Sequence, residues 1–213
     1  MYKYNANFCK NILLEDKQMK KVLALSLAVI MLVCFAACGG GAKVEPYEGT
    51  LAAAVDAIYE KQPVEFMVAP ATEIDLTDAW AVKSYLGLGE VQENENGEAA
   101  PAADFGIKEA VFSESMIGAQ AYSLVLVRLN DSSKMEEIKK AMFDGIDTRK
   151  WICVEADQLR VVSCKDVILL VMASSQLAEG LADGMVNAFA GVINGEAVED
   201  AATVLNGEVL KKG

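Results

Sequence analysis

The segment from Met19 to Cys38 constrains this chain more than any other part of its sequence. It begins with Lys20 and Lys21, continues as an uncharged apolar run and ends in two alanines before Cys38. A basic start, an apolar core and small residues before a cleavage point are typical of an export signal. We therefore expect only the chain from Cys38 onward to fold, and to do so outside the cytoplasm.

Cys38 is the candidate lipidation site. The run Phe35-Ala36-Ala37-Cys38 resembles the cleavage motif of bacterial lipoprotein signals, in which the cysteine is acylated and becomes the new N-terminus, with Phe in place of the commoner Leu. The alternative is an uncleaved membrane helix, because a span needs roughly 20 apolar residues. Three glycines follow Cys38 and make a poor end for a helix, so cleavage is the favoured interpretation.

The signal divides the chain into segments. Residues 1–18 contain Glu15 and Asp16 and precede a natural start at Met19, so we interpret them as an artefact of start-site choice. A polar, acidic stretch at 91–104 has no periodicity and predicts a mobile loop. The expected order is a signal peptide at 19–37, a flexible tether at 38–47, a single domain at 48–196 and a C-terminal tail at 197–213.

The charge of the mature chain limits its partners. Without residues 1–37 the chain has 14 basic and 29 acidic residues, a net charge of −15. Nucleic acid is an unsuitable partner, because binding it requires Lys and Arg to neutralise phosphates. An anionic membrane also repels such a domain, so we expect attachment to the outer face of the cell membrane through the lipid on Cys38 alone.

Hydrophobic periodicity predicts an α+β domain. Helices are expected after Thr50 and at 78–86, 133–144 and 177–193, with Ser133 and Glu136 as a capping box. Strands are expected at 107–115, 121–129, 151–155, 159–164 and 167–173. The second of these strands is apolar on both faces and should be central. The predicted architecture is an antiparallel sheet of about five strands with helices packed on one face.

The order of these elements resembles an uncharacterised family of small lipoproteins from Gram-positive anaerobic bacteria, a domain of unknown function. The resemblance covers roughly residues 45–193. It depends on the lipobox with its three glycines and on the runs Ala110-Val111-Phe112, Tyr122 to Arg128 and Arg149-Lys150-Trp151. It implies no activity and no site residues.

The residue types exclude several chemistries. The chain has no histidine, which rules out Ser-His-Asp and Cys-His catalysis, and no Ser-x-x-Lys motif occurs. The acidic loop has Ala103 where a calcium loop needs a bidentate Glu, so neither a metal site nor a cofactor is predicted. Glu73, Asp75 and Asp78 are candidate acid/base carboxylates, although complementing a helix dipole is their favoured role.

Cys153 and Cys164 are the two cysteines left once Cys38 carries lipid. If a two-residue turn joins strands 151–155 and 159–164, they lie diagonal to each other, about 7 Å apart and too far for a disulfide. A four-residue loop would place them opposite each other. We expect free, partly buried thiols.

A possible contact patch is formed by Arg149, Lys150 and Trp151. These cations either complement the preceding helix while Trp151 packs beneath them, or bind an anionic partner such as a wall polymer. The sequence favours a membrane-anchored extracytoplasmic lipoprotein with a non-enzymatic binding or scaffolding domain, whose partner is an envelope polymer or protein. The alternative is an envelope enzyme that uses carboxylates on a substrate such as a glycan, with Trp80 or Trp151 as a sugar platform.

Overall fold

A computed structural model describes residues 45–89, 105–195 and 200–213. Cys38, the signal peptide and most of the tether lie outside the described residues, as does the acidic loop expected at 91–104. One compact unit spans Val44–Gly213.

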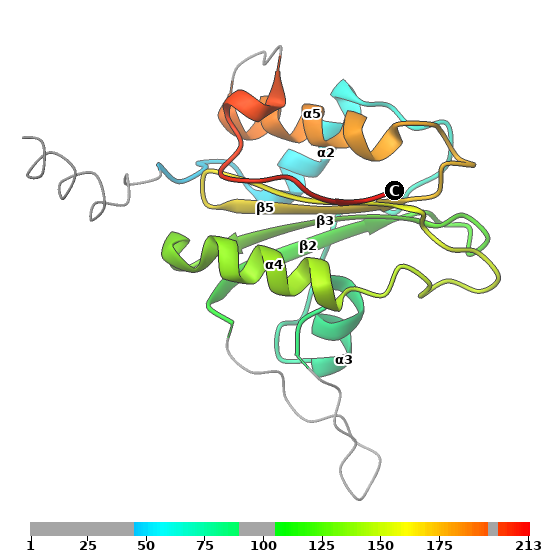
Figure 1. The fold of residues 1–213 in the computed structure, drawn as a ribbon, viewed down its shortest axis with the longest axis horizontal. Coiled ribbons are helices and arrows are strands. Elements are labelled where there is room, and N and C mark those ends of the chain that lie inside the picture. The colour runs from blue at the N-terminus through cyan, green and yellow to red at the C-terminus, as the bar shows by residue number, and fades with distance from the viewer. Residues whose placement is uncertain (1–44, 90–104, 196–199) are drawn as a thin grey trace, which may run out of the picture. The chain divides into compact units, whose positions relative to one another are not determined.

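The helices and strands largely follow the predicted order (Figure 1). In chain order they are α2 (Leu51–Lys61), β1 (Thr72–Glu73), α3 (Ala79–Ala81), the π-helical turn η1 (Val82–Leu86), β2 (Ile107–Glu114), β3 (Tyr122–Leu129), the 3₁₀ turn η2 (Ser132–Lys134), α4 (Met135–Gly145), β4 (Gln158–Cys164), β5 (Val167–Ala173), α5 (Leu181–Asn194), the 3₁₀ turn η3 (Ala201–Thr203) and β6 (Leu210–Lys212).

The strands form one antiparallel sheet in the order β1-β2-β3-β5-β4-β6. This confirms the α+β class and the antiparallel sheet, with six strands where about five were expected. The predicted central strand, β3, pairs with β2 and β5 and is buried along its whole length. The two strands that the sequence did not indicate are the short edges, β1 and β6, which have too few residues to show a period.

The helices cover both faces of the sheet, which corrects the expectation of one covered face (Figure 1). One core contains residues of α2 and α5, and the other contains residues of η1 and α4. Alternate residues of β3 enter the two cores: Leu124 and Leu126 enter the first, Val125 and Val127 the second. A strand that is apolar on both faces needs a layer on each side, and this pattern already argued against a single layer.

Local chemistry sets where the helices begin and end. Thr50 caps α2 as predicted, its side chain accepting a hydrogen bond from the amide of Ala53. The predicted capping box is wrong, because Asp131 caps the 3₁₀ turn that precedes α4. On the lower face in Figure 1, Gly87 and Gly145 bring η1 and α4 into backbone contact, where a β-carbon on Gly145 would overlap the Gly87 carbonyl.

The run at 151–155 is not a strand, which corrects the strand predicted there. These residues belong to the connection between α4 and β4, and Ile152 and Cys153 in it are exposed. The helix expected from residue 177 begins at Leu181, after Gly180 in a left-handed conformation. Apolar side chains within a loop produced both errors, because a short apolar run does not by itself distinguish a loop from a strand or helix.

Residues 200–213 belong to the domain and are not a separate tail. β6 pairs with β4, and the fully buried ammonium of Lys139 donates hydrogen bonds to the carbonyls of Asn206 and Glu208 at 3.2 and 2.9 Å. Lys139 also forms an ion pair with Glu136. Lys140, the next residue of α4, forms an ion pair with Asp144.

Candidate functional site

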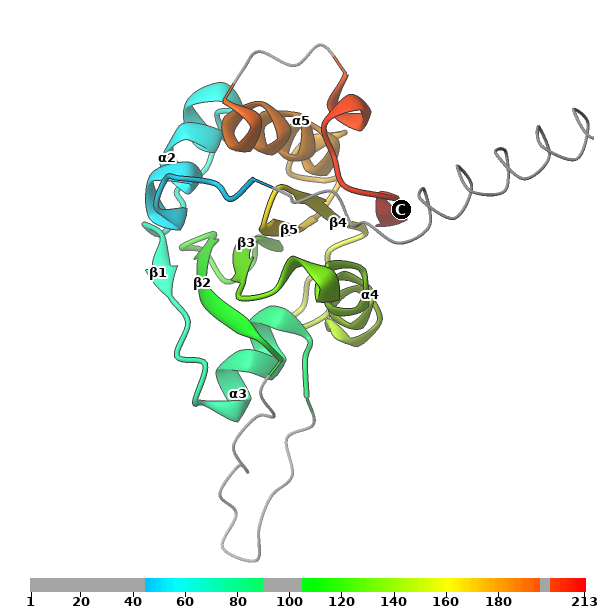
Figure 2. The same cartoon turned by 90° about the vertical axis from the view of Figure 1, so that its left-hand side faces the viewer.

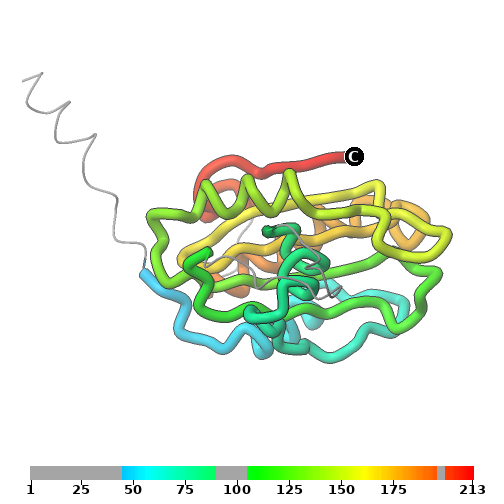
Figure 3. Tube along the Cα trace, turned by 90° about the horizontal axis from the view of Figure 1, so that it is seen from below, coloured from blue at the N-terminus to red at the C-terminus, as the bar shows by residue number. Residues whose placement is uncertain are grey.

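Four connections meet at one end of the sheet, which we call the loop end. They are residues 62–71, 115–121, 146–157 and 174–180, and they lie together at the right in Figures 1 and 3. The pairing explains this arrangement. Ala173, the last residue of β5, pairs with Tyr122 and Gln158, the first residues of β3 and β4, while an isolated bridge joins Val68 to Ser115.

Four large hydrophobic side chains are exposed at the loop end, and we call them the apolar rim. Met67 and Met116 are each 63% exposed, Ile117 is 43% exposed and Ile152 is 83% exposed. The amide of Met116 donates a hydrogen bond to the carbonyl of Met67 at 3.0 Å, which fixes these two loops side by side. Large apolar side chains gathered on a surface are typical of interaction sites, and methionine adapts to varied partners.

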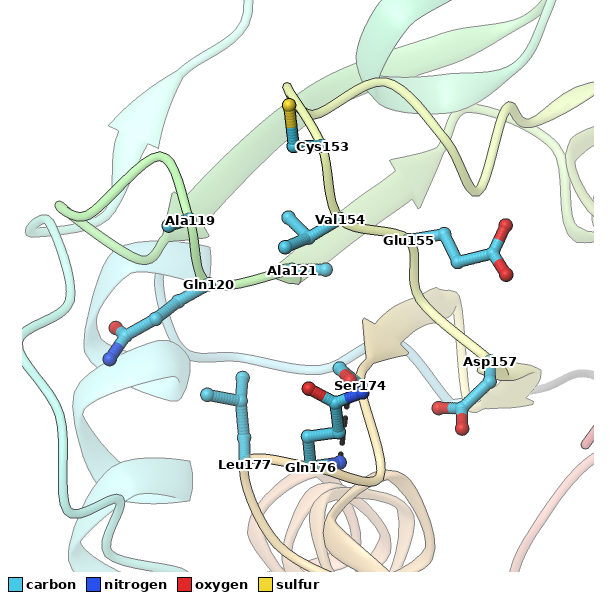
Figure 4. A pocket seen from close by; sticks show the side chains of 10 residues that line it. All are labelled: Ala119, Gln120, Ala121, Cys153, Val154, Glu155, Asp157, Ser174, Gln176 and Leu177. Atoms are coloured by element: carbon cyan, nitrogen blue, oxygen red, sulfur yellow. Dashed lines mark hydrogen bonds between the residues drawn. The ribbon is translucent and has the colours of Figure 1, made fainter.

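A pocket of about 260 Å³ lies between three of the four connections (Figure 4). The β2–β3 turn, the 146–157 connection and the segment after β5 supply its walls. The lining residues are Ala119, Gln120, Ala121, Cys153, Val154, Glu155, Asp157, Ser174, Gln176 and Leu177. They include two carboxylates and no Lys or Arg, so the pocket is acidic.

The two carboxylates of the pocket differ in their surroundings. Asp157 accepts hydrogen bonds from the amide and hydroxyl of Ser175, and these bonds lower the pKa of its carboxyl. Glu155 makes no hydrogen bond or ion pair to any residue that the structure describes. Figure 4 shows both carboxylates on the same side of the pocket. The lowered pKa keeps the Asp157 carboxylate negatively charged at neutral pH, and Glu155 is available to a ligand.

The opposite end of the sheet, which we call the anchor end, binds the start of the domain. Arg128, at the end of β3, donates hydrogen bonds of 2.6 Å to Glu109 and to the carbonyl of Gly49. Its Nε lies 3.5 Å from Asp166, close enough for an ion pair but without hydrogen-bond geometry. Asp166 in turn accepts a 2.7 Å hydrogen bond from the amide of Tyr47. Residues 47–49 therefore lie at the end of the sheet opposite the pocket. Figure 2 views the sheet from the anchor end and shows the start of the domain, in blue, in front of it.

The structure divides the predicted patch of Arg149, Lys150 and Trp151. Arg149 is exposed, whereas Lys150 is largely buried and forms an ion pair with Glu114 on β2. Burial lowers the pKa of the Lys150 ammonium, and the nearby Glu114 carboxylate opposes that shift. Trp151 packs against the core beside α4. One of the two positive charges in this patch is therefore paired inside the protein, and the other, on Arg149, is exposed.

Aromatic rings surround Lys150. Its ammonium lies 4.8 Å from the centre of the Tyr85 ring and 5.2 Å from that of Trp151. Tyr85 stacks on Phe112 at 4.0 Å and meets the exposed Trp80 edge-on at 6.3 Å. Ser123 lies 3.4 Å from the Lys150 ammonium but is fully buried, so no substrate reaches this Ser-Lys pair.

The predicted carboxylates Glu73, Asp75 and Asp78 do not line the pocket. Asp78 caps α3, accepting hydrogen bonds from the amides of Trp80 and Ala81. Asp75 accepts hydrogen bonds from the hydroxyl and amide of Thr77, which lower the pKa of its carboxyl. Glu73 is exposed on the edge strand β1. Only Asp78 therefore has the predicted role at a helix start, while Asp75 stabilises a turn and Glu73 lies in a strand.

The two cysteines have different environments. Cys153 is exposed in the 146–157 connection with a φ of 65°, and Cys164 is buried in β4. Both are free. The register argument does not apply, because Cys153 is not in a strand.

Sequence reasoning did not identify the apolar rim or the pocket. One usable signal was present: Met116 and Ile117 are large apolar residues at the turn of a hairpin, where polar residues and glycine are usual. The pocket gave no such signal, since its walls come from three separate connections.

The structure describes residues 45–89, 105–195 and 200–213. Within them no group of three or more Cys, Asp or Glu side chains is arranged to hold a metal ion. No helix there has the length and hydrophobicity to cross a membrane.

Comparison with known proteins gives no relative. No family model, no curated protein and no solved structure matches this chain. The resemblance to a lipoprotein family stays a prediction, and the functional argument depends on the site itself.

Proposed function

We propose that this chain is a lipoprotein anchored to the outer face of the cell membrane, with a non-enzymatic domain that binds a partner protein at the loop end. The apolar rim carries the proposal, since four large hydrophobic side chains are exposed on loops at the same end of the sheet as the pocket. Monomeric proteins rarely expose such groups together unless they bind something.

The two ends of the sheet support this division of roles. The tether from Cys38 enters the domain at Tyr47, which the anchor end holds through Asp166. β3 runs from the loop end to the anchor end, and eight residues at about 3.3 Å each separate the two ends by about 25 Å. A lipid on Cys38 thus leaves the loop end free to extend away from the membrane.

The alternative is an envelope enzyme that uses carboxylates. Because Glu73, Asp75 and Asp78 are occupied locally, such an enzyme would depend on Glu155 and Asp157 in the pocket. It would release product from a glycan, and Glu155→Gln would abolish that release. A binding domain gives no turnover with either form.

Anchoring is tested by metabolic labelling with a fatty-acid analogue. The native chain should give a labelled band, and Cys38→Ala should abolish it, because the thiol is the acylated group. Label that persists in this variant would refute the assignment of the anchor.

Binding is tested by photocrosslinking in intact source cells. A photoreactive amino acid at Ile117 or Ile152 should give an adduct with the same protein from both positions. Lys140, exposed on α4, is the matched control and should give none. If the loop-end positions give no adduct, or the control gives the same one, the binding function of the loop end is wrong.

A further inference from the structure

We infer that the partner presents a segment in which a Lys or Arg side chain lies beside large apolar side chains. The cation would enter the acidic pocket, and the apolar side chains would cover the rim. This inference depends on the proposed binding function and adds the chemical class of the partner.

The charges of the loop end favour a cation. Its four connections contain five carboxylates, at Glu65, Asp147, Glu155, Asp157 and Glu179, and two cations, at Arg149 and Lys150. One of the cations, Lys150, is already paired with Glu114 on β2. The loop end is therefore negative, as is the mature chain, and charge complementarity selects a basic partner.

The pocket walls suit a long basic side chain. Val154 and Leu177 are apolar lining residues, and Glu155 and Asp157 supply carboxylates in the same pocket. Lys and Arg carry a charge at the end of an apolar stem, so apolar walls and acidic groups match both parts of such a side chain. Glu155 has no partner among the described residues, so it can pair with a cation without breaking an existing hydrogen bond or ion pair.

The rim and the pocket belong to the same loops. Met116 and Ile117 precede three lining residues of the β2–β3 turn, and Ile152 precedes Cys153 and Val154. A bound segment that places its cation in the pocket therefore meets apolar side chains from two of the connections that form the walls. This arrangement explains why the rim and the carboxylates occur together.

Other occupants fit less well. An anionic lipid surface repels an acidic loop end, and the tether enters the domain at the opposite end. Two copies of this chain would bring two acidic loop ends together. An anionic wall polymer would find Arg149 as the one cation of the loop end without an internal ion pair among the described residues.

The test uses the full-length lipidated chain in nanodiscs of phosphatidylcholine. A phage library that displays random 12-residue peptides is selected on it, and binding of the enriched peptides is measured by fluorescence anisotropy. We expect enrichment of peptides with Lys or Arg next to Leu, Ile or an aromatic residue. Enrichment of peptides without a basic residue overturns the inference.

Matched variants locate the bound peptide. Glu155→Gln with Asp157→Asn should weaken binding about tenfold at low salt and less at high salt, because screening reduces charge pairing. Glu155→Gln alone should act in the same direction without touching the bonds to Ser175. Asp56→Asn with Glu137→Gln removes the same two charges from exposed positions on α2 and α4 and should change little.

The remaining outcomes are also decisive. Ile117→Ser with Ile152→Ser should weaken binding, and unchanged binding in this variant would place the peptide elsewhere and overturn the inference. Binding that is lost in the rim variant but unchanged in both charge variants would refute the cation. Co-sedimentation of the lipidated chain, held in its phosphatidylcholine nanodiscs, with anionic phosphatidylglycerol vesicles would favour a membrane as the occupant. If any of these results appears while the crosslinks persist, only the partner class is wrong.

Discussion

The two ends of the same sheet use their side chains in opposite ways. At the anchor end, Arg128 contacts Glu109, Asp166 and the carbonyl of Gly49. Its positive charge is therefore paired inside the protein and fixes the start of the domain to the sheet. At the loop end, Met116 and Ile152 face solvent and Glu155 has no partner among the described residues. One end is internally satisfied, and the other leaves groups available for binding.

The loop end is nevertheless held in place. Lys150 pairs with Glu114, which fixes the 146–157 connection to β2. Ser175 donates two hydrogen bonds to Asp157, which joins the segment after β5 to the start of β4. A surface held in place before binding loses less conformational entropy when a partner arrives. The side chains of the loop end are thus available for binding, although the backbone that carries them is held in place.

The largest effect should follow from removing the cation of the anchor end. Arg128→Met leaves two carboxylates near each other without their cation, and removal of one partner of a buried pair costs about 3 kcal/mol. Urea unfolding should show that loss. The control, Arg149→Met at the loop end, changes an exposed side chain and should shift the stability by less than about 0.5 kcal/mol. Equal losses in the two variants would remove the contrast between the ends.

The two free thiols report on both ends in one experiment. Cys153 is exposed at the loop end, whereas Cys164 is buried at the anchor end and donates a hydrogen bond to the carbonyl of Val204. Burial raises the pKa of the Cys164 thiol, which lowers its thiolate fraction. In the folded chain Cys153 should react with a maleimide about 100-fold faster, since Cys164 reacts only after local opening.

Single replacements assign the two rates. Cys153→Ser should abolish the fast phase, and Cys164→Ser should abolish the slow one. A mass deficit of two hydrogens in the untreated chain would reveal a disulfide. It would contradict the assignment of Cys153 and Cys164 as free thiols.

The smallest effect concerns the pH dependence of the loop end. Hydrogen bonds from Ser175 hold the pKa of the Asp157 carboxyl below its usual value of 3.8. Their contribution is therefore complete above that usual value and is lost as the pH falls through the lower folded pKa. NMR should show the Ser175 amide shifting with a midpoint below pH 3.8, and Asp157→Asn should remove this transition. A midpoint above 3.8 would mean that the bonds do not form.

Several elements of the fold were predictable from short stretches of sequence. The alternating and continuous apolar runs identified β2, β3, β4 and β5, and helical spacing identified α2 and α4. These elements are long enough for burial on one or both faces to repeat several times. The edge strand β6 has three residues and depends on pairing with β4, so its sequence contains no comparable signal.

The predicted site residues show the limit of local reasoning. Arg149, Lys150 and Trp151 are adjacent in sequence, yet the structure exposes the first, pairs the second with Glu114 and packs the third on the core. Glu114 is 36 residues from Lys150, and nothing near either residue indicates that they meet. Adjacent residues in a loop point in different directions, so a run of cations need not form one surface.

The sequence by itself determined the class of the domain, its acidity and the absence of histidine chemistry, because these follow from composition and periodicity. It also predicts the lipid anchor at Cys38 from a contiguous motif. Only the tertiary structure decided that Lys150 pairs with Glu114, and that the pocket and the apolar rim lie at the end of the sheet opposite Tyr47. The physical reason is that strand pairing brings together loops distant in sequence, and a site made by such loops has no continuous sequence pattern.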